Sequence, residues 1–258
     1  MTPFTVVIYG AVGVGKSSVV KALVSSASRR RQSTNAAALV YGIREPTEAL
    51  VDSGALDDVY ENRTSSGYRL QMLVLAERMS TYWQMAAELS RTESDVPSAH
   101  IASSPAPMVI FDGHIGLDDD IFVDEHVRNG RMSRAECNSY VCAAHIMLAQ
   151  CPAFAQQPNM YVYLRGDAQT CAQRAAKRGR VEESALDTAF FARMVAACDA
   201  VTKVLATQNS TIVVTINSDD VSLVDVCDAV RNAINVHYRA AGAEQDMTLP
   251  TARFADIL

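Results

Sequence analysis

Residues 10–17 read GAVGVGKS, and this stretch decides the fold. It satisfies the pattern G-x-x-x-x-G-K-[ST], it follows the apolar run TVVIY at 5–9, and it opens a helical pattern at 17–25. A strand, a glycine-rich loop and a helix in this order can bind phosphate, because backbone N–H groups and the positive end of the helix dipole surround the anion. The pattern therefore predicts a nucleoside triphosphate site with phosphate contacts from Gly10, Val12, Gly13, Val14, Gly15, Lys16, Ser17 and Ser18.

Two side chains of this loop carry chemistry. Lys16 reaches the β- and γ-phosphates, and the Ser17 hydroxyl can ligate Mg²⁺. A second metal ligand is expected from Asp112, a carboxylate at the end of the apolar run 108–111. The expected cofactor is therefore Mg²⁺, and the expected phosphoryl donor is ATP.

Short apolar runs alternate with helical patterns along the chain. The runs lack polar alternation, which is typical of strands covered on both faces, and they occupy 5–9, 38–43, 108–111, 160–164 and 211–216. The helical patterns occupy 17–25, 68–89, 134–148, 168–177, 186–206 and 221–238. This alternation predicts a doubly wound α/β fold with a five-stranded parallel sheet and helices on both faces. We expect a single domain over residues 1–240, with a Ser/Pro-rich loop at 91–107 and a loosely held tail at 241–258.

Composition argues against several classes of protein. Hydrophobic residues make up 49 % and charged residues 20 % of the 258 residues, which is ordinary for a globular protein. The net charge of −6 gives no general electrostatic reason to bind nucleic acid or an anionic membrane. No apolar run approaches a membrane span, and no basic region precedes the first apolar run, so we expect no signal peptide. The six cysteines are scattered without metal-binding spacing, which favours reduced thiols in the cytoplasm.

A basic segment lies far downstream of the phosphate-binding loop. RAAKRGRVEE at 174–183 places Arg174 and Arg178 on one helix face, with Arg180 in the turn that follows. A solvated basic helix face is the commoner outcome for such a cluster taken alone. Beside a phosphate-binding loop, the three arginines instead predict a catalytic lid at 178–184 that binds phosphoryl oxygens and excludes water.

Other classes of nucleotide-binding protein fit less well. The chain lacks the Asn-Lys-x-Asp sequence with which GTPases read guanine. PMVIFDGH at 107–114 could be the Walker B strand of a mechanical ATPase, with Asp112 as its magnesium carboxylate. The arginine-rich segment favours a small-molecule kinase instead.

Four segments in this order resemble the deoxynucleoside kinase family, which includes cellular deoxycytidine and deoxyguanosine kinases and herpesvirus-type thymidine kinases. They are GAVGVGKSS, REP at 44–46, FDGHIGLDDDIF at 111–122 and RAAKRGRVEE, and the resemblance covers residues 5 to 220. It implies a P-loop kinase fold and Mg²⁺-dependent phosphorylation of the 5′-hydroxyl of deoxynucleosides, in nucleotide salvage for DNA precursor synthesis. It also implies a homodimer.

The resemblance further implies roles for individual residues. Glu45 matches the general base that takes the proton of the 5′-hydroxyl. Gln71 matches the amide that reads the base edge, and Phe122 matches the aromatic ring that stacks on the base. Tyr60 and Glu183 match the pair that holds the 3′-hydroxyl. For Tyr60 and Phe122, packing in the core is an equal alternative.

The Arg78 and Asp118 positions match a pair that marks the deoxycytidine and deoxypurine kinases. In those relatives the pair occupies the space that the 5-methyl group of thymine would need. We therefore expect deoxycytidine or a deoxypurine nucleoside as the favoured substrate, with thymidine as a further possibility.

Two positions depart from the family pattern. Gly113 stands where the family has an arginine that organises the strand-end acid, and Leu50 stands where it usually has tryptophan. One hypothesis is that another arginine compensates, with Arg44 the nearest in sequence. The other is that the chain binds nucleotides but phosphorylates slowly or not at all. A nucleoside monophosphate kinase of the thymidylate type is the alternative enzyme. Gly113 and the tail suit a divergent viral member of the family. In that case we expect the protein in the cytoplasm of the host cell.

Overall fold

Five parallel strands form the central sheet, in the order β2-β3-β1-β4-β5. They are β1 (Phe4–Tyr9), β2 (Val40–Ile43), β3 (Met108–Asp112), β4 (Met160–Arg165) and β5 (Ile212–Asn217). This computed structural model describes residues 2–33, 39–61, 63–95, 105–180, 183, 186–208 and 211–240, and for 29–33, 60, 93–95 and 240 it describes the backbone alone. The prediction of a five-stranded parallel α/β fold is confirmed.

Burial along the strands follows their place in the sheet. Every residue of β1 and β3 is buried, as is all of β4 except Arg165, whereas the edge strands β2 and β5 are partly exposed. Central parallel strands are covered on both faces, which is why their sequences read as nearly continuous apolar runs. Ile8 of β1 lies opposite Asp112 of β3, and Ile43 of β2 lies opposite Phe111. The strands therefore end at one edge of the sheet, where ligands bind in open α/β folds.

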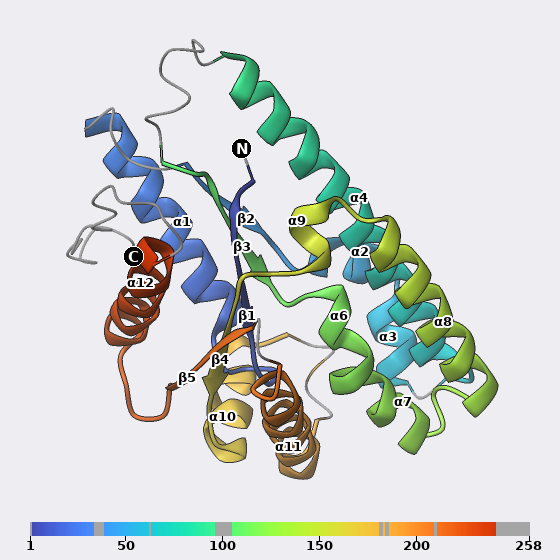
Figure 1. The fold of residues 1–258 in the computed structure, drawn as a ribbon. Coiled ribbons are helices and arrows are strands. Elements are labelled where there is room, and N and C mark those ends of the chain that lie inside the picture. The colour runs from blue at the N-terminus through green and yellow to red at the C-terminus, as the bar shows by residue number, and fades with distance from the viewer. Residues whose placement is uncertain are drawn as a thin grey trace.

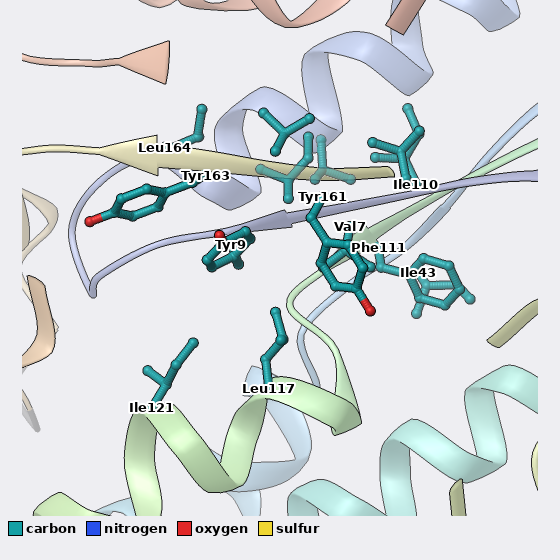
Figure 2. Close-up of a cluster of buried hydrophobic side chains, with 14 of the residues drawn as sticks. Val7, Tyr9, Ile43, Ile110, Phe111, Leu117, Ile121, Tyr161, Tyr163 and Leu164 are labelled. Carbon is teal, nitrogen blue, oxygen red and sulfur yellow. The ribbon is translucent and has the colours of Figure 1, made fainter. Parts of the chain in front are cut away.

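Helices cover both faces of this sheet (Figure 1). α1 (Lys16–Ser33) and α12 (Leu223–Ala240) pack together on one face. The other face carries α4 (Ser66–Asp95), α8 (Arg134–Gln150), α9 (Ala153–Gln156) and α11 (Thr188–Leu205). Figure 2 shows Leu117 and Ile121 pointing from short helices toward the sheet, where the rings of Tyr9 and Tyr161 lie. These contacts fix the segment that follows β3 against the core.

Side-chain caps set the N-terminal ends of two helices. α10 (Ala168–Arg178) begins after Asp167, whose side chain accepts a hydrogen bond from the backbone N–H of Thr170, and it ends at Gly179 with φ of 73°. α8 begins with a capping box formed by Ser133 and Glu136. Such caps satisfy backbone N–H groups that the first turn of a helix leaves unpaired.

Several short helices do not appear among the sequence predictions. They are α2 (Thr47–Asp52), α3 (Ala55–Tyr60), α6 (Ile115–Asp118), the π-helix η1 (Asp119–Val123), α7 (Asp124–Arg128) and α9. Elements of four to six residues are too short to show a helical period in sequence. α4 also continues to Asp95, into the segment 91–107 expected as a loop; residues 96–104 and the expected tail 241–258 lie outside the described part of the chain.

Membrane insertion is not indicated by the helices. None of those in the described ranges combines the length and the apolar character that crossing a bilayer requires.

Candidate active site

The phosphate-binding loop joins β1 to α1 and is pressed against two other elements. Gly10 has φ of 150° and Gly13 φ of 80°. A Cβ at these positions would lie 2.4 Å from the carbonyl oxygen of Leu164 and 2.2 Å from that of Cys171. Both positions therefore require glycine. The ammonium group of Lys16 donates to the carbonyl oxygen of Gly10 at 2.9 Å, which holds it over the loop.

Most of the predicted phosphate contacts line one pocket. These are Val12, Gly13, Gly15, Lys16, Ser17 and Ser18. Gly10 lines a smaller cavity that adjoins the pocket, and Val14 is buried.

Two carboxylates from neighbouring strand ends face this loop. Asp112 ends β3 and is 1 % exposed, and Glu45 follows the end of β2; both line the smaller cavity beside Lys16. Burial raises the pKa of the Asp112 carboxyl, the charge of Glu45 raises it further, and Lys16 and a hydrogen bond from Ser17 lower it. Within the described residues, Oδ1 of Asp112 is buried without a hydrogen-bond partner. An unpaired carboxylate oxygen beside a hydroxyl is a donor set that fits Mg²⁺.

A buried guanidinium group borders these carboxylates. Arg78 of α4 is 3 % exposed, and its Nε lies 3.0 Å from Oδ2 of Asp118. Its Nη1 donates to the carbonyl oxygen of Asp112 at 3.1 Å. Burial raises the pKa of Asp118 to about 6, and the charge of Arg78 opposes that rise. Gly113 has φ of 73°, and a Cβ there would lie 2.6 Å from Nη2 of Arg78. The guanidinium group therefore fills the space in which a side chain at position 113 would begin.

The three arginines of the predicted lid separate into two groups. Arg178 donates to both carboxylate oxygens of Glu183 at 2.5 Å, and Arg180 donates to one of them at 3.2 Å. These three residues line the pocket. Arg174 instead donates to the carbonyl oxygen of Val14 at 3.3 Å and to that of Ser218 at 2.6 Å. Arg174 thus joins the phosphate-binding loop to the end of β5.

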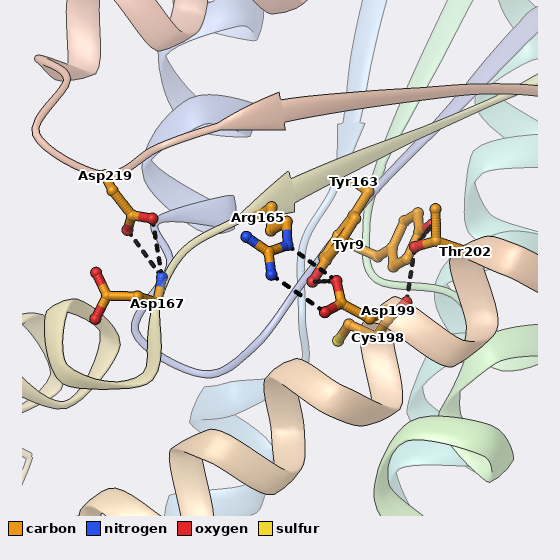
Figure 3. A network of polar contacts seen from close by, with 8 residues as sticks. All are labelled: Tyr9, Tyr163, Arg165, Asp167, Cys198, Asp199, Thr202 and Asp219. Atoms are coloured by element: carbon orange, nitrogen blue, oxygen red, sulfur yellow. Dashed lines mark hydrogen bonds and ion pairs between the residues drawn. The ribbon is translucent and has the colours of Figure 1, made fainter.

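The helices on either side of the lid segment are anchored to the ends of β4 and β5 (Figure 3). Asp199 of α11 accepts hydrogen bonds from the Tyr163 hydroxyl at 2.9 Å and from Nε of Arg165 at 3.1 Å. The carboxylate of Asp219 accepts from the backbone N–H of Asp167, with its two oxygens at 2.9 and 3.0 Å. These contacts hold the start of α10 and the middle of α11 against the ends of β4 and β5.

A family profile described as deoxynucleoside kinase matches residues 6–237. The chain belongs to the deoxynucleoside kinase family. A solved structure of deoxyadenosine kinase from M. mycoides with bound dCTP is 17 % identical, with a TM-score of 0.64, and the match covers 90 % of this chain and 100 % of that one. A structure of deoxyadenosine kinase from M. mycoides with products dCMP and a flexible dCDP is 16 % identical, with a TM-score of 0.61 and the same coverage. At this identity the likeness concerns the fold. Comparison with curated proteins gives no match.

Beyond the phosphate-binding loop, the lining of the kinase pocket includes eight apolar side chains and one amide. Gln71 of α4 is 4 % exposed, and its Nε2 lies 3.3 Å from Nε2 of His126. Its Oε1 is buried and has no partner among the described residues. The apolar lining consists of Leu50, Leu56, Val59, Leu70, Val74, Phe122, Phe190 and Met194. Leu50, one of the two family departures, is therefore part of this lining.

The structure places most of the predicted kinase residues on this one pocket. Beyond the phosphate-binding loop these are Glu45, Gln71, Arg78, Asp118, Phe122, Arg178, Arg180 and Glu183. The side chain of Tyr60 lies outside the described residues, although its helix α3 contributes Leu56 and Val59 to the lining. Arg44 is exposed and is not part of the pocket lining.

Sequence reasoning missed four polar residues of the kinase pocket, Thr47, Glu125, His126 and Arg131. The Glu125 carboxylate accepts from Arg193 at 2.6 and 2.8 Å and from Nδ2 of Asn129 at 2.8 Å. Spacing gave no reliable signal for His126, because the π-helical turn at Asp119–Val123 interrupts the helical period between Phe122 and His126.

Proposed function

We propose that this kinase transfers the γ-phosphoryl group of ATP to the 5′-hydroxyl of a deoxynucleoside, with deoxycytidine or a deoxypurine nucleoside favoured. One observation carries the proposal. The phosphate-binding loop, Glu45 and the buried amide of Gln71 all line a single pocket, and Glu45 and Lys16 also share the smaller cavity. This arrangement suits a nucleoside whose sugar lies between a base-reading group and a triphosphate.

The phosphoryl transfer forms a bond between the 5′-oxygen and the γ-phosphorus and breaks the bond from that phosphorus to the bridging oxygen of ADP. Glu45 accepts the hydroxyl proton. Glu45 and Asp118 both line the main pocket and the cavity beside Lys16, but Asp118 is held in an ion pair with Arg78. Lys16, Arg178 and Arg180 neutralise charge on the transferring group. Ser17 and Asp112 would hold Mg²⁺, which would neutralise phosphate charge during the transfer.

Arg78 supplies a guanidinium group next to position 113, where the family has a further arginine. It contacts the backbone of Asp112 directly and occupies the space above Gly113, whereas Arg44 is exposed. This arrangement supports active catalysis rather than nucleotide binding alone. It also leaves the Arg78–Asp118 pair beside the pocket, which supports the preference for deoxycytidine or a deoxypurine. The two similar structures are of a deoxyadenosine kinase and hold dCTP, or dCMP with dCDP.

Transfer from labelled ATP with Mg²⁺ tests the proposal, with deoxycytidine, deoxyadenosine, deoxyguanosine, thymidine and thymidine monophosphate supplied separately. We expect product with deoxycytidine or a deoxypurine nucleoside. Product with thymidine alone would contradict the assigned preference, and turnover of the monophosphate alone would indicate a nucleoside monophosphate kinase. Binding of ATP without any turnover would indicate a nucleotide-binding protein.

The homodimer implied by the family resemblance is part of the proposal. Trp83 of α4 is 53 % exposed and Ile146 of α8 is 60 % exposed, and these two helices pack against one another. Large exposed apolar side chains on adjacent helices favour association. Light scattering on the purified chain should give the mass of two copies, and a monomer mass at micromolar concentration would contradict this expectation.

A further inference from the structure

Gln71 and His126 form a buried contact in the lining of the pocket. Gln71 is 4 % exposed and His126 is 7 % exposed. A Cβ on Gly67, one helical turn before Gln71, would lie 2.6 Å from Cγ of the imidazole ring. The glycine therefore makes room for the ring beside the amide. Oε1 of Gln71 and Nδ1 of His126 are both buried without a partner in the described parts of the chain.

The imidazole of His126 is neutral at physiological pH. Burial, and to a smaller extent the positive charge of Arg131, lowers its pKa to about 4. A neutral imidazole has one N–H donor and one acceptor nitrogen, so its tautomer decides what Nε2 offers to the amide. When the proton is on Nδ1, Nε2 accepts from the Gln71 amide N–H. When the proton is on Nε2, Gln71 must turn its Oε1 toward the ring.

We propose that His126 is a positioning residue for base recognition, which fixes the orientation of the Gln71 amide and thereby the base edge that the pocket reads. The structure has Nε2 of Gln71 toward His126, so Oε1 remains as an unpaired acceptor. This acceptor fits an exocyclic amino group. The inference rests on the proposed function and names the substrate class: nucleosides of the amino bases cytosine and adenine.

Keto bases need the opposite arrangement. Thymine and guanine present carbonyl oxygens where cytosine and adenine present amino groups. To bind them, the amide must rotate and the His126 proton must move from Nδ1 to Nε2. The kinase can make this change, but the change disrupts the observed arrangement of Gln71 and His126. Deoxycytidine and deoxyadenosine should therefore have higher kcat/KM than thymidine and deoxyguanosine.

A double-mutant cycle with His126→Leu and Gln71→Met tests the coupling. In the wild-type kinase we expect the amino-base nucleosides to be preferred. Leucine at 126 cannot orient the amide, so His126→Leu should reduce that preference by about fivefold, the worth of one hydrogen bond. In the Gln71→Met background, His126→Leu should leave the preference unchanged. An unchanged preference in the His126→Leu single variant, or the same reduction in both backgrounds, would overturn the proposal.

Two further measurements keep the test decisive should His126→Leu fold poorly. Gly67→Ala should displace the ring and reproduce the reduced preference. Nitrogen NMR of the histidine rings, of which the chain has five, should show His126 protonated at Nδ1 with deoxycytidine bound and at Nε2 with thymidine bound. The same tautomer with both nucleosides would overturn the proposal. If the wild type phosphorylates no nucleoside, the proposed function fails, while the NMR comparison still tests base reading by this pair.

Discussion

The substitution Gly113→Ala tests whether Arg78 is held in place. The glycine has φ of 73°, a conformation that costs alanine about 1 kcal/mol. The added Cβ would lie 2.6 Å from Nη2 of Arg78. The guanidinium group can withdraw only by lengthening its 3.0 Å ion pair with Asp118 or its 3.1 Å hydrogen bond to the Asp112 carbonyl. Removing one partner of a buried ion pair costs about 3–5 kcal/mol. Because Gly113→Ala only weakens this pair, the total decrease in the free energy of unfolding should be about 2–4 kcal/mol.

Gly130→Ala is the matched control for this measurement. Gly130 has φ of 69°, and no heavy atom lies within 4 Å of a Cβ built on it. It should lose only the backbone contribution, about 1 kcal/mol, when the free energy of unfolding is measured in urea. In an Arg78→Ala background, the extra loss from Gly113→Ala should disappear. Equal losses for Gly113→Ala and Gly130→Ala in the wild-type background would refute the claim that Arg78 is fixed over position 113.

Three further outcomes follow from the site and the core. Glu45→Gln should lower kcat by about 10²–10⁴-fold with little change in the KM for ATP, and the exposed neighbour Glu48→Gln should leave both unchanged in the same kinetic assay. Arg178→Ala should lower kcat by about 10²–10³-fold in single-turnover transfer. A change confined to KM would mean that Arg178 contributes to substrate binding and not to the transfer step. Burial lowers the pKa of His114 to about 4, below the pKa of histidine in the unfolded chain. The free energy of unfolding should therefore decrease as the pH is lowered from 6.5 to 4, because the unfolded state takes up the proton first. His114→Gln should reduce this loss by up to about 3 kcal/mol in urea titrations at several pH values, and the exposed His145→Gln should not.

The sheet was predictable because its signals are local and strong. Nearly continuous apolar segments mark β1, β3 and β4, since both faces of these strands are buried. Each observed strand coincides with a predicted run to within a residue or two at the ends. The segment between β3 and α8 was not predictable in this way. There α6, η1 and α7 follow one another in pieces of four or five residues, and the wider π-helical turn interrupts the period on which helix prediction depends.

The same limit explains which parts of the site the sequence could indicate. Glu45, Asp112 and the phosphate-binding loop follow strands, so a parallel sheet alone brings them to one edge. The contact between Arg78 and Gly113 joins the middle of a long helix to a strand end, and sequence distance does not report it. For that reason Arg44 was the expected substitute for the missing arginine, although its side chain is exposed. Family comparison by position treats the glycine as the loss of a charge. The geometry instead shows a small residue and a guanidinium group sharing one space, so the two positions have to be considered, and varied, together.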